Sequence, residues 1–220
     1  MKFSIGKEWP YLALIALPII YLAIIWNGLP NELPMHWNIK GEVDRWGSKS
    51  ELWIMPFLLP GLIYLIMLIV PAIDPKQQLE KMEGKYEQFK FIMVLFMSIL
   101  ALYIIYSAQQ QSLMAPNALF VLIGLMFAGI GNYFQTIKPN YFLGIRTPWT
   151  LENEIVWKQT HKMGGVLWMV GGLVIVGISL LFSKMSTLFM VLFLSITTLL
   201  CIIPLIYSYQ LFQKLKGSEG

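Results

Sequence analysis

Long stretches of this 220-residue sequence contain no charged residue at all. Charged residues make up 13% of the chain, well below the quarter that is usual in soluble domains, whereas hydrophobic residues make up 57%. The charges gather in short segments between apolar runs. A lipid bilayer demands this segregation, because an isolated charge in hydrocarbon is costly. The composition therefore excludes an ordinary soluble domain and predicts an integral membrane protein.

Several motifs that carry enzymatic chemistry are scarce or missing. The single cysteine, Cys201, lies in an apolar run and supports neither a disulfide framework nor a cysteine-based metal site. The sequence has no glycine-rich phosphate loop, which excludes ATP hydrolysis by this chain. Its two histidines, His36 and His161, have no evident catalytic partners. We therefore predict a protein that is not an enzyme and binds no cofactor.

Six apolar runs account for most of the chain. Each has roughly 17–24 residues, enough to cross about 30 Å of hydrocarbon at ~1.5 Å per residue. They cover residues 9–29, 52–73, 91–107, 118–137, 164–182 and 186–209. The sequence thus predicts an all-α, polytopic membrane bundle of six transmembrane helices. Spans with these limits hold no Asp, Glu, Lys or Arg, which disfavours an ion-coupled transporter. Prolines 18, 56, 60 and 204 predict kinks or non-helical turns.

The basic residues predict the orientation of the bundle. With both termini in the cytoplasm, 12 of the 16 Lys and Arg residues lie inside and four lie outside. Short cytoplasmic loops carry such an excess, so we predict that both ends are inside. The net charge of +4 then reflects topology rather than nucleic-acid binding. Residues 1–75 hold two spans with an outer loop, and residues 76–220 hold four spans with an inner loop, all in one integrated membrane domain.

The outer segment, residues 29–49, is rich in Pro, Gly and Trp. One interpretation is a surface that meets an extracellular peptide, with Trp37 and Trp46 as apolar anchors and Arg45 and Lys49 as charges. A metal site is a weaker alternative, because one histidine with scattered carboxylates lacks a defined ligand spacing. Its candidate ligands are His36, Glu32, Glu42 and Asp44. The commoner role for His36 is a hydrogen bond to a backbone carbonyl.

The inner segment, residues 131–162, follows the fourth span. Thr147 before Pro148 predicts a helix N-cap followed by proline at the first helical position. We therefore expect a short interfacial helix that runs into the fifth span, with Trp157 and His161 on one of its faces. Asn132 is a polar group at the inner end of the fourth span, where it needs a partner.

Arg146 has three open interpretations. It is a candidate to contact lipid headgroups, to pair with Glu152 or Glu154, or to bind another protein. The residues alone do not choose among these roles.

Both segments resemble a known family. The inner segment contains Gly131-Asn132-Tyr133, Lys138-Pro139-Asn140 and the run Gly144-Ile145-Arg146-Thr147-Pro148-Trp149-Thr150-Leu151, followed by Trp157 and His161. This pattern is specific and resembles the signature of the SdpI family of bacterial membrane proteins. The outer segment is similar to a short domain of unknown function that often precedes it. The matching residues are Leu33-Pro34, His36-Trp37-Asn38, Gly41 and Ser48-Lys49.

The resemblance implies a multi-pass protein of the bacterial cytoplasmic membrane that confers immunity to a secreted toxic peptide. It also implies signalling, in which the membrane protein recruits a cytoplasmic transcriptional repressor. The candidate outer binding residues, from the resemblance and from the peptide-surface interpretation together, are His36, Trp37, Asn38, Gly41, Arg45 and Lys49. The implied inner ones are Asn132, Asn140, Gly144, Arg146, Thr147, Pro148, Trp149, Trp157 and His161. A transporter of a small molecule, lipid or peptide and a membrane scaffold remain alternatives, and the oligomeric state is open.

Overall fold

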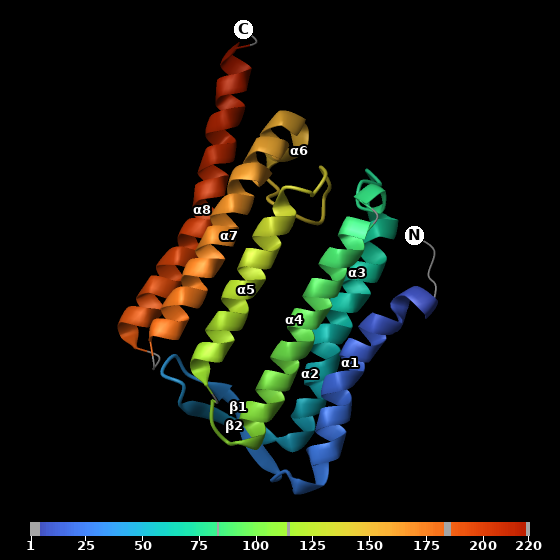
Figure 1. Cartoon of the computed structure of the whole chain (residues 1–220), viewed down its shortest axis with the longest axis vertical. Helices are drawn as coiled ribbons and strands as arrows, with labels where there is room; N and C mark the ends of the chain where they lie inside the picture. Colours follow the sequence, from blue (N-terminus) through green and yellow to red (C-terminus); the bar gives the residue numbers. More distant parts are fainter. Residues whose placement is uncertain (1–4, 83, 114, 183–185, 219–220) are drawn as a thin grey trace.

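The computed structural model describes residues 5–82, 84–113, 115–182 and 186–218. Within these residues, six helical segments are long and apolar enough to cross a membrane, which confirms the predicted six-span bundle (Figure 1). Five spans are single helices, namely α1 (Ile5–Ile25), α4 (Gly84–Gln109), α5 (Pro116–Phe134), α7 (Glu154–Leu181) and α8 (Thr187–Ser218). The structure adds a two-stranded hairpin that the sequence did not predict, formed by β1 (Glu32–Trp37) and β2 (Val43–Ser48).

The second span is built from four short elements. These are η2 (Lys49–Trp53), α2 (Ile54–Pro56), a π-helical turn η3 (Phe57–Gly61) and α3 (Leu62–Ile73). Pro60 has no backbone N–H to donate to the carbonyl of Pro56, so the regular hydrogen-bond ladder is broken there. The sequence predicted kinks or non-helical turns at Pro56 and Pro60, and the structure has a π-helical turn there within a span that stays helical. Pro18 and Pro204, by contrast, lie inside the continuous helices α1 and α8.

The helices form two groups. The first contains α1, the second span and α4, and the second contains α5, α7 and α8, with α4 and α5 in contact between them (Figure 1). Both chain ends and the short helix α6 (Pro148–Glu152) lie at one end of the bundle, called here the terminal end. The β1–β2 hairpin lies at the opposite, hairpin end. The two segments singled out in the sequence thus occupy opposite ends of the molecule.

The helices α5 and α7 make the most extensive interhelical contact in the bundle. Their backbones touch, because a Cβ added at Gly172 would lie 2.4 Å from the carbonyl oxygen of Gly124 and 2.5 Å from the amide nitrogen of Ala128. A Cβ added at Gly131 would lie 2.4 Å from the amide nitrogen of Met169. Small residues allow this close approach, which is a common device of membrane helices.

Replacing Gly172 by alanine should lower the stability of the bundle. The new methyl group meets backbone atoms that cannot move independently, so we expect a loss of about 1–3 kcal/mol, as in overpacked cores. Gly177 lies on the same helix with nothing within 4 Å of an added Cβ. Gly177→Ala should therefore be neutral or stabilising by up to ~1 kcal/mol. Unfolding of both variants in detergent checks this, and equal effects would contradict the close contact.

Candidate functional site

The hairpin carries the outer segment. Its turn depends on Asn38, whose Oδ1 accepts hydrogen bonds from the backbone N–H groups of Lys40 and Glu42 at 2.8 and 3.1 Å. Gly41 has a φ of +80°, a conformation that glycine adopts without strain. Asn38 and Gly41 were predicted as binding residues, and the geometry gives both a role in shaping the turn.

His36 faces Asp44 across the hairpin. Its Nδ1 lies 2.5 Å from Asp44 Oδ1, and both side chains are largely exposed. The expected bond from His36 to a backbone carbonyl is therefore wrong, because the neighbouring strand offers a carboxylate instead. Among the described residues, no group of three His, Cys, Asp or Glu side chains is placed to hold a metal ion.

Lys49, the first residue of η2, and Arg45 of β2 tie the hairpin to the start of the second span and the end of the first. The Lys49 ammonium lies 3.5 Å from the carbonyl oxygens of both Trp26 and Leu29, and 4.8 Å above the Trp26 ring. Arg45 pairs with Glu51 at 3.2 Å. Both charges were predicted to meet a peptide, yet each already has partners within the protein.

The two tryptophans of the hairpin differ in exposure. Trp46 is 50% exposed, and Ile39, near the turn, is 69% exposed. Trp37 is partly buried against the cluster of Leu22, Leu29 and Leu33, and its indole N–H has no partner within the described residues. Of the two predicted apolar anchors, Trp46 is the one presented to the surroundings.

The inner segment folds into a hydrogen-bonded loop between α5 and α7. Asn140 is fully buried at its centre. Its Oδ1 accepts from the N–H groups of Phe142 and Leu143 at 2.8 and 2.7 Å, and its Nδ2 donates to the carbonyls of Lys138 and Leu143. Asn140 thus satisfies the polar backbone of a segment that has no regular ladder of its own.

His161 holds the next part of this loop. Its Nε2 accepts from the backbone N–H of Ile145 at 2.9 Å, and its Nδ1 lies 2.8 Å from the carbonyl oxygen of Trp157. Since Nε2 accepts, the proton must sit on Nδ1 and the ring must be neutral. Gly144 has a φ of +99°, and a Cβ there would lie 2.3 Å from His161 Nε2. Glycine is therefore required next to this histidine.

Trp157 completes the same cluster from one turn earlier in α7. Its ring stacks on that of His161 with the centroids 4.1 Å apart, and its indole N–H donates to the carbonyl of Ile137 at 2.8 Å. Both side chains are buried. The predicted pairing of these two residues on one helix face is confirmed, and both act on the backbone of the loop.

The short helix α6 begins as the sequence predicted. Thr147 is its N-cap and Pro148 its first residue, and Thr147 and Thr150 form a reciprocal capping box. The indole N–H of Trp149 donates to Ser208 of α8 at 2.6 Å, which ties α6 to the last span. The expected continuous run into the fifth span is interrupted, however. Asn153 leaves the helical conformation and caps α7 through its own side chain.

Three of the predicted inner residues face outward. Asn132, Arg146 and Pro148 are exposed. Arg146 donates to the carbonyl of Tyr141 rather than to a glutamate, so the expected alternative of pairing with Glu152 or Glu154 is not found. The inner segment therefore has a buried structural part and an exposed surface that contains Arg146 and Pro148.

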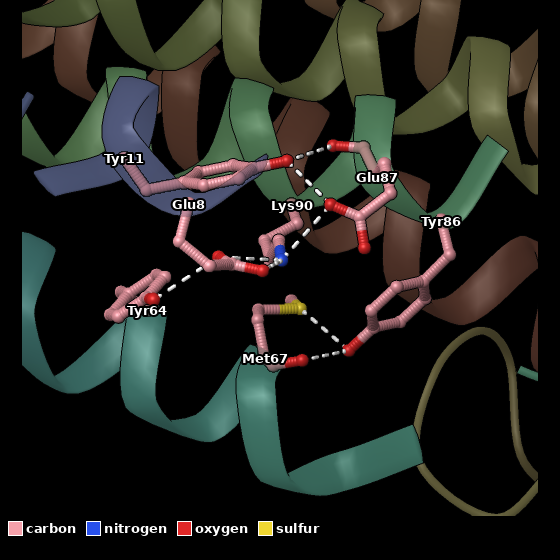
Figure 2. A network of polar contacts seen from close by, with 7 residues as sticks. All are labelled: Glu8, Tyr11, Tyr64, Met67, Tyr86, Glu87 and Lys90. Carbon is pink, nitrogen blue, oxygen red and sulfur yellow. Dashed lines mark hydrogen bonds and ion pairs between the residues drawn. The ribbon is translucent and has the colours of Figure 1, made fainter. Parts of the chain in front are cut away.

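A second polar constellation lies inside the first helix group, near the terminal end. Figure 2 shows the ammonium of Lys90 on α4 between two carboxylates, 3.3 Å from Glu8 Oε2 and 3.0 Å from Glu87 Oε2. Tyr11 donates a hydrogen bond to Glu87 at 2.7 Å, and Tyr64 donates to Glu8 at 3.1 Å. Glu8 and Lys90 are almost fully buried. The cluster joins α1, α3 and α4.

This cluster corrects one expectation from the sequence. Glu8 and Lys90 each precede the first residue of a predicted span, at positions 9 and 91, and were left outside the membrane segments. The helices start earlier, so both charges lie within them. The sequence did contain a signal for this pair. Glu8 and Lys90 have opposite charges and stand at the ends of the first and third spans that lie on the same side of the membrane. The absence of ionisable groups therefore no longer counts against ion-coupled transport.

An open cavity of about 370 Å³ lies beside the cluster. It is lined by residues of α1, α4 and α5, including Tyr11, Glu87 and Gln88, and Tyr133 donates to Gln88 at 3.2 Å across it. Glu87 is one-third exposed, in contrast to its neighbours. The Glu87 carboxylate is therefore the part of the cluster that solvent or a ligand can reach.

Removing the buried cation should destabilise the protein strongly. Lys90→Met leaves Glu8 charged and without its ion pair, which costs about 3–5 kcal/mol in buried pairs. The double variant Lys90→Met with Glu8→Gln removes both charges and should recover most of this loss. Lys85→Met, an exposed lysine of the same helix, is the matched control. Thermal unfolding in detergent checks the series, and a Lys90→Met variant as stable as the control would contradict it.

The fold and the two loop segments define a six-span membrane protein with a hairpin at one end and a side-chain-braced loop at the other. Residues 136–208 match the model of the SdpI/YfhL protein family, and residues 13–59 match a domain of unknown function, DUF1648. The recognition of the SdpI family from the sequence is confirmed by these matches.

One curated relative matches over nearly the whole chain. It is described as immunity protein SdpI of Bacillus subtilis (strain 168), and it is 24% identical over 209 residues. The match covers 94% of this chain and 96% of the relative. No solved structure matches the chain significantly. The relative and the family together support a membrane immunity function.

Proposed function

We propose that this protein protects a bacterial cell from a secreted toxic peptide, acting in the cytoplasmic membrane with the hairpin outside and the terminal end inside. One observation carries the proposal: the similarity to an immunity protein extends over 94% of the chain. It therefore includes the hairpin, the inner segment and all six spans. The excess of basic residues at the terminal end supports the orientation.

The hairpin is the part of the chain best suited to meet such a peptide. Trp46 and Ile39 present exposed apolar surface on the hairpin. Exposed tryptophans of this kind are frequent anchors in protein recognition. The hydrogen bonds of Asn38 fix the turn of the hairpin, and those of Lys49 hold its base on the bundle, so little conformational entropy is lost when a peptide binds. Direct binding at the outer surface is the mechanism that we favour.

Cells that make the protein should survive a toxic peptide that kills cells without it, and Trp46→Ser should weaken this protection. We expect the loss of an aromatic anchor to weaken peptide binding by roughly tenfold or more. The matched control is Trp9→Ser, because Trp9 is 64% exposed but lies near the start of α1, the end of that helix remote from the hairpin. Survival curves with a panel of peptides, at equal membrane levels of each variant, check the prediction.

Equal killing of both strains by every peptide in the panel would remove the immunity function. Protection that Trp9→Ser and Trp46→Ser reduce equally would retain immunity and reject the hairpin as the contact surface.

A second role is recruitment of a soluble transcriptional repressor at the terminal end. The supporting observation is the exposed surface of Arg146, Pro148 and Tyr141, which sits on a loop braced from beneath by Asn140 and His161. A rigid loop with an exposed arginine suits protein recognition. The residues that the family signature contributes to the interior hold this surface in shape.

Arg146→Glu should abolish recruitment while leaving the stability of the protein unchanged, because the side chain is exposed. Lys85→Glu makes the same charge change at another exposed position of the terminal end and should have no effect. His161→Leu should lower stability as well as recruitment, because the N–H of Ile145 would lose its acceptor. Co-purification of a soluble partner with each variant, together with thermal unfolding, checks this. Recruitment by Arg146→Glu at the unaltered level would count against the role.

A further inference from the structure

A groove of about 600 Å³ opens between α7 and α8 at the terminal end. Its apolar lining includes Ile155, Met163 and Val166 of α7, and its polar lining includes Lys158 and Lys162 of the same helix. Tyr207 of α8 lines the other side of the groove, and its hydroxyl lies 3.5 Å from Gln159 Oε1.

The groove lies where a membrane surface meets the helix. With 28 residues, α7 is about 42 Å long and exceeds the hydrocarbon thickness of about 30 Å by roughly two turns. If the end of α7 nearer the hairpin lies at one boundary of the hydrocarbon, the first two turns of α7 extend beyond the other boundary and lie among the lipid headgroups. Lys158 and Lys162 then point into the headgroup layer, and Val166 lies one turn deeper, beside the acyl chains.

The charges in the groove are uncompensated. Among the described residues, no carboxylate comes within ion-pair distance of Lys158 or Lys162. Two ammonium groups above an apolar floor are complementary to a ligand with an anionic head and a hydrocarbon tail. Basic pockets between membrane helices on the cytoplasmic side recognise anionic lipid headgroups in this way.

We propose that this groove binds an anionic phospholipid of the leaflet at the terminal end. Lys158 and Lys162 contact the phosphate-bearing headgroup, and one acyl chain packs along Met163 and Val166. The opposite face of α7 holds Trp157 and His161. A lipid seated here thus supports, from behind, the helix that braces the inner segment.

The same lipid would also contact the last span, α8. Tyr207 lines the groove, and its neighbour Ser208 accepts the hydrogen bond from Trp149 of α6. The groove and the inner segment therefore both rest on α7 and, through α6, on α8, so lipid binding should also raise the thermal stability of the inner segment.

The test titrates the purified full chain in detergent with short-chain phosphatidylglycerol and, separately, phosphatidylcholine, and native mass spectrometry measures the dissociation constants. We expect phosphatidylglycerol to bind more tightly, and Lys158→Gln with Lys162→Gln to weaken it roughly tenfold to thirtyfold. The charge-matched control is Lys81→Gln with Lys85→Gln, an exposed pair with the same spacing at the same end. It should retain the affinity of the unaltered protein.

Two further arms separate the proposed occupant from others. Val166→Trp fills the apolar part of the groove and keeps both lysines, so it should also weaken the binding of phosphatidylglycerol. Unchanged affinity would mean that the lipid binds through surface charge alone and not in the groove. Inorganic phosphate should not displace the lipid, and displacement would identify a soluble phosphate ligand instead. Equal losses in both lysine pairs, or a change in self-association without a change in lipid affinity, would overturn the proposal.

Discussion

The backbone contact between α5 and α7 is the constraint on which the rest of the structure depends. The two helices approach closely because four of their facing residues are Gly124, Gly131, Gly165 and Gly172. A Cβ added at any of these glycines would lie within 2.7 Å of a carbonyl oxygen of the other helix. This contact fixes the start of α7 relative to the end of α5. The inner segment must bridge that short distance, and its course is set by the two helices that it joins. Larger residues at these positions would push the two helices apart and so move Trp157 and His161 relative to the end of α5.

The inner segment shows how an irregular backbone is tolerated at the edge of a membrane. Its polar groups are satisfied by side chains, with Asn140, His161 and Trp157 replacing the partners that a helix or sheet would supply. Most of the residues that resemble the family signature have this structural purpose. The exposed Arg146 and Pro148 are different. Pro148 begins α6 and Arg146 donates to the carbonyl of Tyr141, but both side chains face outward, so they are the stronger candidates for recognition.

The sequence alone predicted the features that depend on local pattern. Apolar run length gave six spans, and the Thr147-Pro148 pair gave the start of α6. The hairpin was missed because its turn depends on the side-chain bonds of Asn38 and on the positive φ of Gly41, which hydrophobic periodicity does not register. The pairing of His36 with Asp44 was missed because it depends on the register of a hairpin that the sequence did not predict. The pairing of Glu8 with Lys90 was missed because each predicted span began one residue after the charge.

The ion pair within the first helix group has a consequence for how the chain is made. Glu8 precedes Lys90 by 82 positions, so its carboxylate leaves the ribosome well before its cation is synthesised. Until α4 arrives, the first turn of α1 is more favourable at the aqueous boundary than between helices, because a buried charge without a partner is costly. The burial of the first turn of α1 is thus tied energetically to the presence of α4, two spans later in the chain.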